Sequence, residues 1–206
     1  PISMLSTTPP TMSTSRDSAI TVTHPSGGES WVPGEVERIY WDATGTAGIF
    51  AVEYSSDSGA TWNSFSAGVP GQARFLDVTV PNVVSADMLV RVKRGGNTGV
   101  SDTTFRVIGV PGNLAVASNC LDYCILRWDS VPGATAYEVS MLGSRYMDSV
   151  STTLTTTDTI RNLLPNQSYW FSVKAIGAGG IEGRRAIAIQ RVPGLVNCPE
   201  PNDVSV

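Results

Sequence analysis

Short stretches of apolar or alternating residues recur along most of this chain at roughly ten-residue spacing, and each ends at Gly, Pro, Asn or Asp. This spacing is typical of strands in a β-sandwich, and no stretch carries a helical 3.6-residue apolar stripe over ten residues. The expected strands form two sets. The first covers 19–23, 36–41, 49–55, 62–65, 74–80, 86–93 and 103–108; the second covers 113–117, 124–129, 136–142, about 151–160, 168–176 and 185–191.

The two sets are separated by Gly-Val-Pro-Gly at 109–112. The pattern therefore predicts an all-β protein built from two tandem β-sandwiches, one over 18–109 and one over 110–193. Residues 1–17 are rich in Ser, Thr and Pro and are expected to be a linker or the tail of an upstream domain, and 194–206 to be a second linker. Because no initiator Met or signal peptide is present, we expect the chain to be part of a longer protein.

Charge and hydropathy exclude two classes of partner. The formal net charge is −4 and the isoelectric point is near 4.9, which argues against nucleic acid as a partner. No apolar run approaches the roughly 20 residues of a membrane-spanning helix. No cofactor is expected.

The second half carries a specific set of strand motifs. "ILRWDSVPGATAYEVSM" (125–141) contains Trp128, a Pro-Gly turn and Tyr137-x-Val139, and "LLPNQSYWFSVKAIGAGG" (163–180) contains alternating residues that begin at Tyr169. Residues 111–193 thereby resemble a fibronectin type III domain. The resemblance implies a tyrosine corner, in which the Tyr169 hydroxyl bonds to the upstream backbone, and a role as spacer or binding platform. The adhesive Arg-Gly-Asp of some members is absent from the loop "GAGGIEG" (177–183).

The first half, about 18–108, resembles a bacterial extracellular Ig-like module, related to modules at the head of yeast cell-wall Kre9/Knh1-like proteins. The pattern is I-x-V-x-x-P-x-G-G-E-x-W-x-x-G, then I-x-W, then Y-S-x-D-x-G-x-x-W. The matching residues are Ile20, Val22, Pro25, Gly27, Gly28, Glu29, Trp31, Gly34, Ile39, Trp41, Tyr54 and Trp62. This resemblance implies a fold more than an activity.

Within it, "YSSDSGATW" (54–62) also resembles the Asp-box of sialidase propellers. A propeller repeats the box over several blades, whereas this chain has one box. We therefore expect a hairpin turn in which Asp57 bonds to nearby backbone, Gly59 takes a positive φ, and Trp62 folds back over the turn.

No pattern in the sequence predicts catalysis. His24 is the single histidine and no G-x-S-x-G string occurs, so a Ser-His-Asp triad is not expected. The carboxylates are scattered and are interpreted as solvated charges. No metal site is predicted, although Asp42 or Asp57 with backbone carbonyls is an alternative site for calcium. We expect the chain not to be an enzyme.

The three cysteines are Cys120, Cys124 and Cys198. We expect a Cys120–Cys124 disulfide across a hairpin, with two free thiols as the alternative. Cys198 would then be unpaired within the chain or bonded to a residue outside it.

Two surfaces are candidate binding sites. Alternation directs Trp170, Ser172 and Lys174 outward from one strand, where an exposed indole could stack on a sugar or anchor a protein. The alternative is that Lys174 or the neighbouring domain covers the indole. Alternation also directs Arg91 and Lys93 outward, joined by Arg106. This basic row could attract an acidic polysaccharide, or be an ordinary solvated face partly balanced by Glu53 and Asp87.

The leading hypothesis is a non-catalytic region of a larger secreted or cell-surface bacterial protein, acting as a spacer, adhesion or assembly module. Its partners would be neighbouring domains of the same polypeptide, with polysaccharide or a surface protein as candidate ligands. Two alternatives are an accessory binding region of a secreted hydrolase, such as a peptidase or glycosidase, and a segment of a surface filament subunit.

Overall fold

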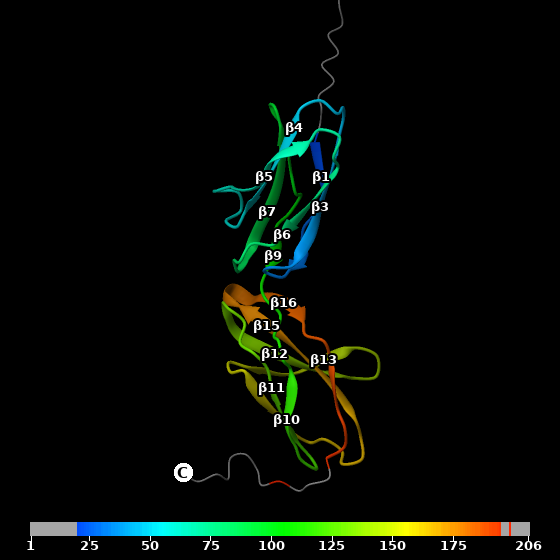
Figure 1. Ribbon diagram of the computed structural model, residues 1–206. Coiled ribbons are helices and arrows are strands. Elements are labelled where there is room, and N and C mark those ends of the chain that lie inside the picture. The colour runs from blue at the N-terminus through cyan, green and yellow to red at the C-terminus, as the bar shows by residue number, and fades with distance from the viewer. Residues whose placement is uncertain (1–19, 195–197, 199–206) are drawn as a thin grey trace, which may run out of the picture.

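The computed structural model describes residues 20–194 and 198, which form two β-sandwiches lying end to end (Figure 1). The first sandwich contains β1 (Ile20–His24), β2 (Ser30–Trp31), β3 (Val36–Ala43), β4 (Ile49–Ser55), β5 (Asn63–Pro70), β6 (Phe75–Thr79), β7 (Ser85–Arg94), β8 (Asn97–Val100) and β9 (Phe105–Val107). The second contains β10 (Ala115–Asn119), β11 (Cys124–Arg127), β12 (Ala134–Leu142), β13 (Met147–Thr153), β14 (Thr157–Ile160), β15 (Tyr169–Gly177), a 3₁₀ turn (Ala178–Gly180), β16 (Ile181–Arg185) and β17 (Ile189–Arg191). The predicted fold class, all-β with two tandem β-sandwiches, is confirmed.

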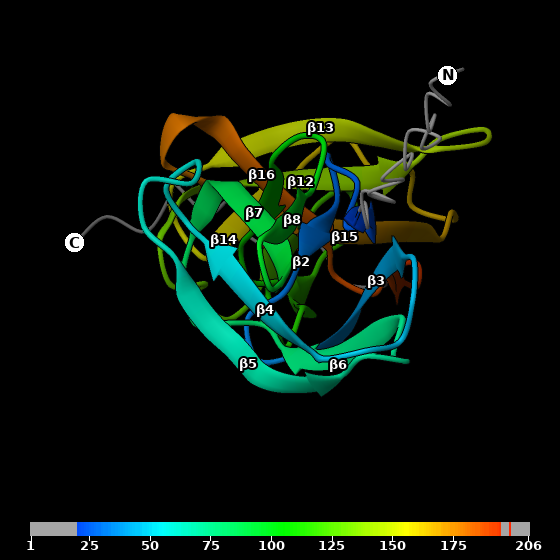
Figure 2. The ribbon, with the colours of Figure 1, turned by 90° about the horizontal axis from the view of Figure 1, so that it is seen from above.

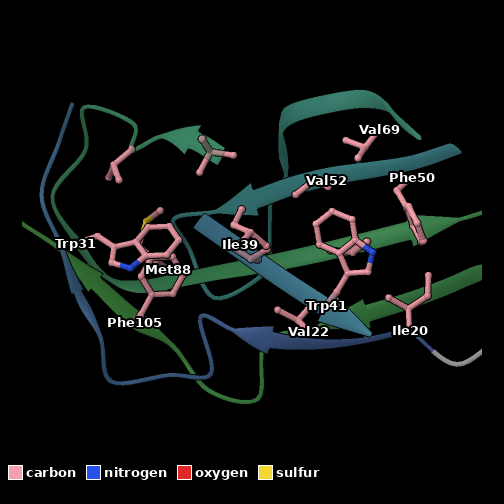
Figure 3. Close-up of a cluster of buried hydrophobic side chains, with 14 of the residues drawn as sticks. Ile20, Val22, Trp31, Ile39, Trp41, Phe50, Val52, Val69, Met88 and Phe105 are labelled. Carbon is pink, nitrogen blue, oxygen red and sulfur yellow. The ribbon is translucent and has the colours of Figure 1, made fainter. Parts of the chain in front are cut away.

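The first sandwich packs a three-stranded sheet, β1-β3-β6, against a larger sheet, β2-β9-β7-β4-β5, in which β8 also pairs with β7 (Figure 2). In β3 and β7, alternate residues face the space between the sheets and are buried, as the period of two requires. Trp41 and Phe50 meet edge to face there, with ring centroids 5.3 Å apart (Figure 3). The inward aromatics therefore fill the interior of this domain.

The second sandwich repeats the arrangement, with β10-β11-β14 facing β13-β12-β15-β16, and β17 pairing with β15. Trp128 and Tyr137 pack edge to face in its core at 5.6 Å, and the Tyr137 hydroxyl accepts a hydrogen bond from the buried Val131 N–H. The hydroxyl of Tyr169 accepts one from the Leu164 N–H at 2.9 Å. The bond expected of a tyrosine corner is therefore present.

The strand pattern differs from the expectation at four places. The single strand expected over 185–191 is two strands, since β16 ends at Arg185 and β17 begins at Ile189. β2 and β8 were not predicted, because β2 has only two residues and β8 has no apolar alternation. The single strand expected over about 151–160 is two strands, β13 and β14, which belong to different sheets. The chain crosses between the sheets within a Thr-rich stretch, whose strand propensity conceals the crossing.

The two sandwiches are joined by a covalent connection and also by side-chain contacts across their junction. The Ile108 N–H donates to the carbonyl of Trp31 in the first sandwich, while the Ile108 side chain is fully buried in the core of the second. Glu35 and Arg184 form an ion pair across the junction. One connecting residue thus has partners in both domains.

Candidate binding surfaces

The basic row of the first sandwich lies on β7 and β9. Arg91 and Lys93 leave the outer face of β7 as predicted, and each forms an ion pair with Glu53 of the neighbouring strand β4. The guanidinium of Arg91 also lies 4.1 Å from the ring centroid of Trp62. Burial opposes the ionisation of Glu53, but hydrogen bonds from Arg91 and Lys93 outweigh it and hold the pKa of Glu53 below its usual value. Much of the predicted positive charge is therefore balanced within the sheet.

Arg106 is separated from this pair along the strands. It lies beside the junction and lines a shallow hollow of about 210 Å³ with glycines from both sandwiches, among them Gly28, Gly179 and Gly180. Its backbone N–H donates to the carbonyl of Glu29. Within the described residues its guanidinium has no ion-pair partner within 4.0 Å.

Trp170 and Lys174 are on the outer side of β15, but they do not form one open surface. The indole of Trp170 is 41% exposed, whereas Lys174 is only 7% exposed. The ammonium group of Lys174 lies 3.1 Å from a carboxylate oxygen of Glu138 and 3.0 Å from one of Glu182. Between them, Ser172 donates to the carbonyl of Ala186 and is covered. The predicted open face is therefore wrong for Ser172 and Lys174, because Ser172 is bonded to Ala186 and Lys174 lies between the carboxylates of Glu138 on β12 and Glu182 on β16.

The hairpin predicted for the Asp-box-like string connects β4 to β5. One carboxylate oxygen of Asp57 accepts from the Ser55 hydroxyl at 2.6 Å and from the Thr61 N–H at 2.8 Å, and the other accepts from the Thr61 hydroxyl at 2.5 Å. Gly59 has a φ of 91°, and the Trp62 indole N–H donates to its carbonyl. Hydrogen bonds from Ser55 and then Thr61 lower the pKa of Asp57 to about 2.

Neither carboxylate considered for calcium belongs to a metal-binding cluster. Asp57 directs its oxygens to its own turn, and Asp42 lies opposite Thr21 in the sheet. Across residues 20–194 and 198, no group of three or more His, Cys, Asp or Glu is placed to hold a metal ion.

His24 is packed at a strand end. Its ring lies 6.0 Å from that of Trp31 and 6.4 Å from that of Tyr40, measured between centroids, and Nδ1 is 3.7 Å from Oε1 of Glu29. Glu29 in turn accepts from the N–H groups of Ser26 and Gly27. These contacts connect the single histidine to the loop between β1 and β2.

The predicted Cys120–Cys124 disulfide is wrong. Cys120 is bonded to Cys198, and Cys124 is a free, buried cysteine. The register explains the error: Cys124 pairs with Asn119, so Cys120 lies one position further on, in the turn, while Cys124 points into the core. Burial raises the pKa of the Cys124 thiol to about 11.

One exposed cluster was missed by the sequence interpretation. Tyr40 on β3 and Phe75 on β6 are directly opposite each other on the outer side of the three-stranded sheet. The same alternation that places Ile39 and Trp41 inward directs Tyr40 outward, so the signal was present in the sequence.

Comparisons with known proteins give one curated relative and several solved β-structures. The tail tube protein gp17.1* of Bacillus phage SPP1 is 28% identical over 159 residues. The match covers 72% of this chain and 57% of that protein, so the chain spans less than two thirds of its relative. No family model matches the chain.

Similar solved structures include the fibronectin type-III domain of human fibronectin type III domain containing protein 3, at 15% identity over 47% of this chain and 93% of that one, with a TM-score of 0.38. Titin domains A168–A170 are 18% identical over 85% of this chain and 66% of that one, also with a TM-score of 0.38. Within the described part of the chain, no helix has the length and hydrophobicity needed to cross a membrane.

Proposed function

We propose that this chain is a non-catalytic tandem of β-sandwiches displayed outside the cell on a tubular or filamentous assembly. The observation that carries the proposal is the 159-residue match to a phage tail tube protein. Among the functions considered from the sequence, this match most strongly supports a segment of a surface filament subunit. The tandem would hold its outer surfaces at a fixed distance from the body of the assembly.

We also propose a domain family for each sandwich. Assignment of the second sandwich to the fibronectin type III family is supported by the hydrogen bond between Tyr169 and Leu164 and by the packing of Trp128 on Tyr137. Assignment of the first to an Ig-like module is supported by its sheet order, in which β1-β3-β6 faces the sheet built around β7.

A spacer role is supported by the junction. Short connections that contain Pro restrict the angle between modules. Here the connection is also packed, since Ile108 is buried in the second core and Glu35 pairs with Arg184. A tandem of this kind would transmit the orientation of one sandwich to the other.

The test is to express the gene product that carries this chain and to examine its assembly by electron microscopy, with and without residues 20–194. We expect tubes or filaments bearing lateral protrusions, and bare tubes of the same diameter after the deletion. Failure of the complete protein to assemble, or loss of the tube itself on deletion, would contradict display on its outside.

A further inference from the structure

The outer side of the three-stranded sheet carries an exposed cluster, here called the aromatic face: Val36, Arg38 and Tyr40 from β3, with Phe75 and Asp77 from β6. The register places Tyr40 opposite Phe75 and Arg38 opposite Asp77. Exposed fractions are 69% for Val36, 43% for Tyr40 and 47% for Phe75. Ile39 and Trp41, which alternate with these residues, are buried, so the sheet is anchored from beneath.

Contacts within the cluster fix the orientation of its rings. The centroids of Tyr40 and Phe75 are 6.3 Å apart, and the planes are tilted by 49°. The guanidinium of Arg38 lies 4.4 Å from the Phe75 centroid and donates two hydrogen bonds to Asp77, at 2.5 and 2.8 Å. Side chains that are already ordered lose little conformational entropy when a ligand binds.

The charge of the aromatic face argues against an acidic ligand. Arg38 and Asp77 neutralise each other, and the exposed Asp42, the next outward residue of β3, adds one negative charge to the same side. The whole chain carries a formal charge of −4, which disfavours nucleic acid and acidic polymers.

The size of the face argues against a globular protein partner. Three strands about 4.8 Å apart and about five residues long span roughly 250 Å². A stable protein interface buries about 800 Å² on each partner. A narrow strip with two adjacent rings instead suits an extended polymer whose units present an apolar ring face and polar edges.

We propose that the aromatic face binds a neutral polysaccharide, with sugar rings stacking on Tyr40 and Phe75 and hydroxyl groups bonding to Arg38 and Asp77. Aromatic side chains combine an apolar body with a preferred stacking geometry, so two adjacent exposed rings can accept the apolar faces of sugar rings. This proposal concerns a ligand of the first sandwich and does not rest on the display role proposed above.

The test uses the chain itself in pull-downs on cellulose, chitin and mannan, with polygalacturonate as the acidic polymer. We expect retention on at least one neutral polymer and at least a tenfold loss of affinity in the double variant Tyr40→Thr/Phe75→Thr. Threonine is chosen because it favours strands, and thermal unfolding checks that the variant folds. Tyr146→Ala is the matched control, an exposed aromatic on the other sandwich that should bind as the wild type does, and Trp170→Ala tests the competing candidate site.

Three pull-down results would overturn the proposal: no retention on any neutral polymer, retention on the acidic polymer alone, or loss of binding in Trp170→Ala with retention in the double variant. Sedimentation of the wild type and the double variant tests self-association separately. A dimer that disappears in the double variant would assign the aromatic face to a second copy of the chain and refute the polysaccharide site.

Discussion

The hydrogen bonds accepted by Asp57 connect the stability of the β4–β5 turn to pH. Its carboxylate accepts two bonds from Thr61 and one from Ser55, and the pKa of Asp57 is about 2 in the folded chain against an ordinary value of 3.8. A carboxyl group whose pKa is lowered by folding stabilises the folded state above its unfolded pKa, and this contribution is lost as the pH falls through the folded pKa.

We therefore expect Asp57→Asn to melt at a lower temperature than the wild type above about pH 4, and the difference to shrink between about pH 4 and pH 2. Thermal unfolding followed by circular dichroism across this range measures it. Asp42→Asn, at an exposed aspartate of β3, is the matched control. An Asp57→Asn effect that is equal at pH 2 and pH 6 would contradict the assigned hydrogen bonds.

Two tyrosine hydroxyls give a second prediction for single residues. Tyr137→Phe leaves the Val131 N–H without its acceptor inside the core and should cost about 1–3 kcal/mol. Tyr169→Phe should cost less, about 0.5–1 kcal/mol, because the Leu164 N–H is close to solvent and water can replace the hydroxyl. Urea unfolding of both variants gives the comparison, and a larger loss for Tyr169→Phe would show that the corner, rather than the core bond, holds the second sandwich.

At the scale of the elements, several segments of the second sandwich are joined at one end of the domain through Arg191 and a disulfide. Arg191 of β17 is buried and donates to the side-chain oxygen of Asn119 and to the carbonyl of Cys120, which is itself bonded to Cys198. Its third connection is to the carbonyl of Gln167 in the loop before β15. The last strand, the turn between β10 and β11 and residue 198 are thus held together at one end of the domain.

Peptide mapping without reduction should therefore yield a cross-linked pair containing Cys120 and Cys198, and Cys124 alone should remain a thiol. With a pKa of about 11, only about one Cys124 in a thousand is a thiolate at pH 8, so alkylation should require unfolding.

Cys198→Ser should lower the free energy of unfolding by about 2–4 kcal/mol, because 78 residues separate the bonded cysteines. A cross-linked peptide containing Cys124 would refute this pairing.

The disulfide is also an example of a feature that could not be predicted from the sequence. Alternation was sufficient to predict the fold class and the inward-facing residues of the long strands, because a period of two decides which side chains are buried. It could not give the pairing of Cys120, which depends on where residue 198 lies in space. The burial of Lys174 between Glu138 and Glu182 and the sheet change between β13 and β14 also depend on long-range geometry that no local pattern records.

At the scale of the whole molecule, the orientation of the two sandwiches depends on a few residues at their junction. The side chain of Ile108 belongs to the second core while its backbone bonds to Trp31 of the first. The ion pair between Glu35 and Arg184 is exposed, so it is expected to contribute at most about 1 kcal/mol. Packing around Ile108 and the following Gly109 should therefore set the angle.

Gly109→Val tests this assignment, because a Cβ at Gly109 would lie only 2.8 Å from Cγ1 of Val131 in the second sandwich, so the connecting segment has to shift against that sandwich. We expect residual dipolar couplings to fit one alignment tensor for both sandwiches in the wild type and two different tensors in Gly109→Val, with the chemical shifts of both cores retained. Gly68→Val is the control, since a Cβ there meets open space on β5. Two tensors already in the wild type would mean that the sandwiches reorient independently, and a spacer of fixed length could not be built from them.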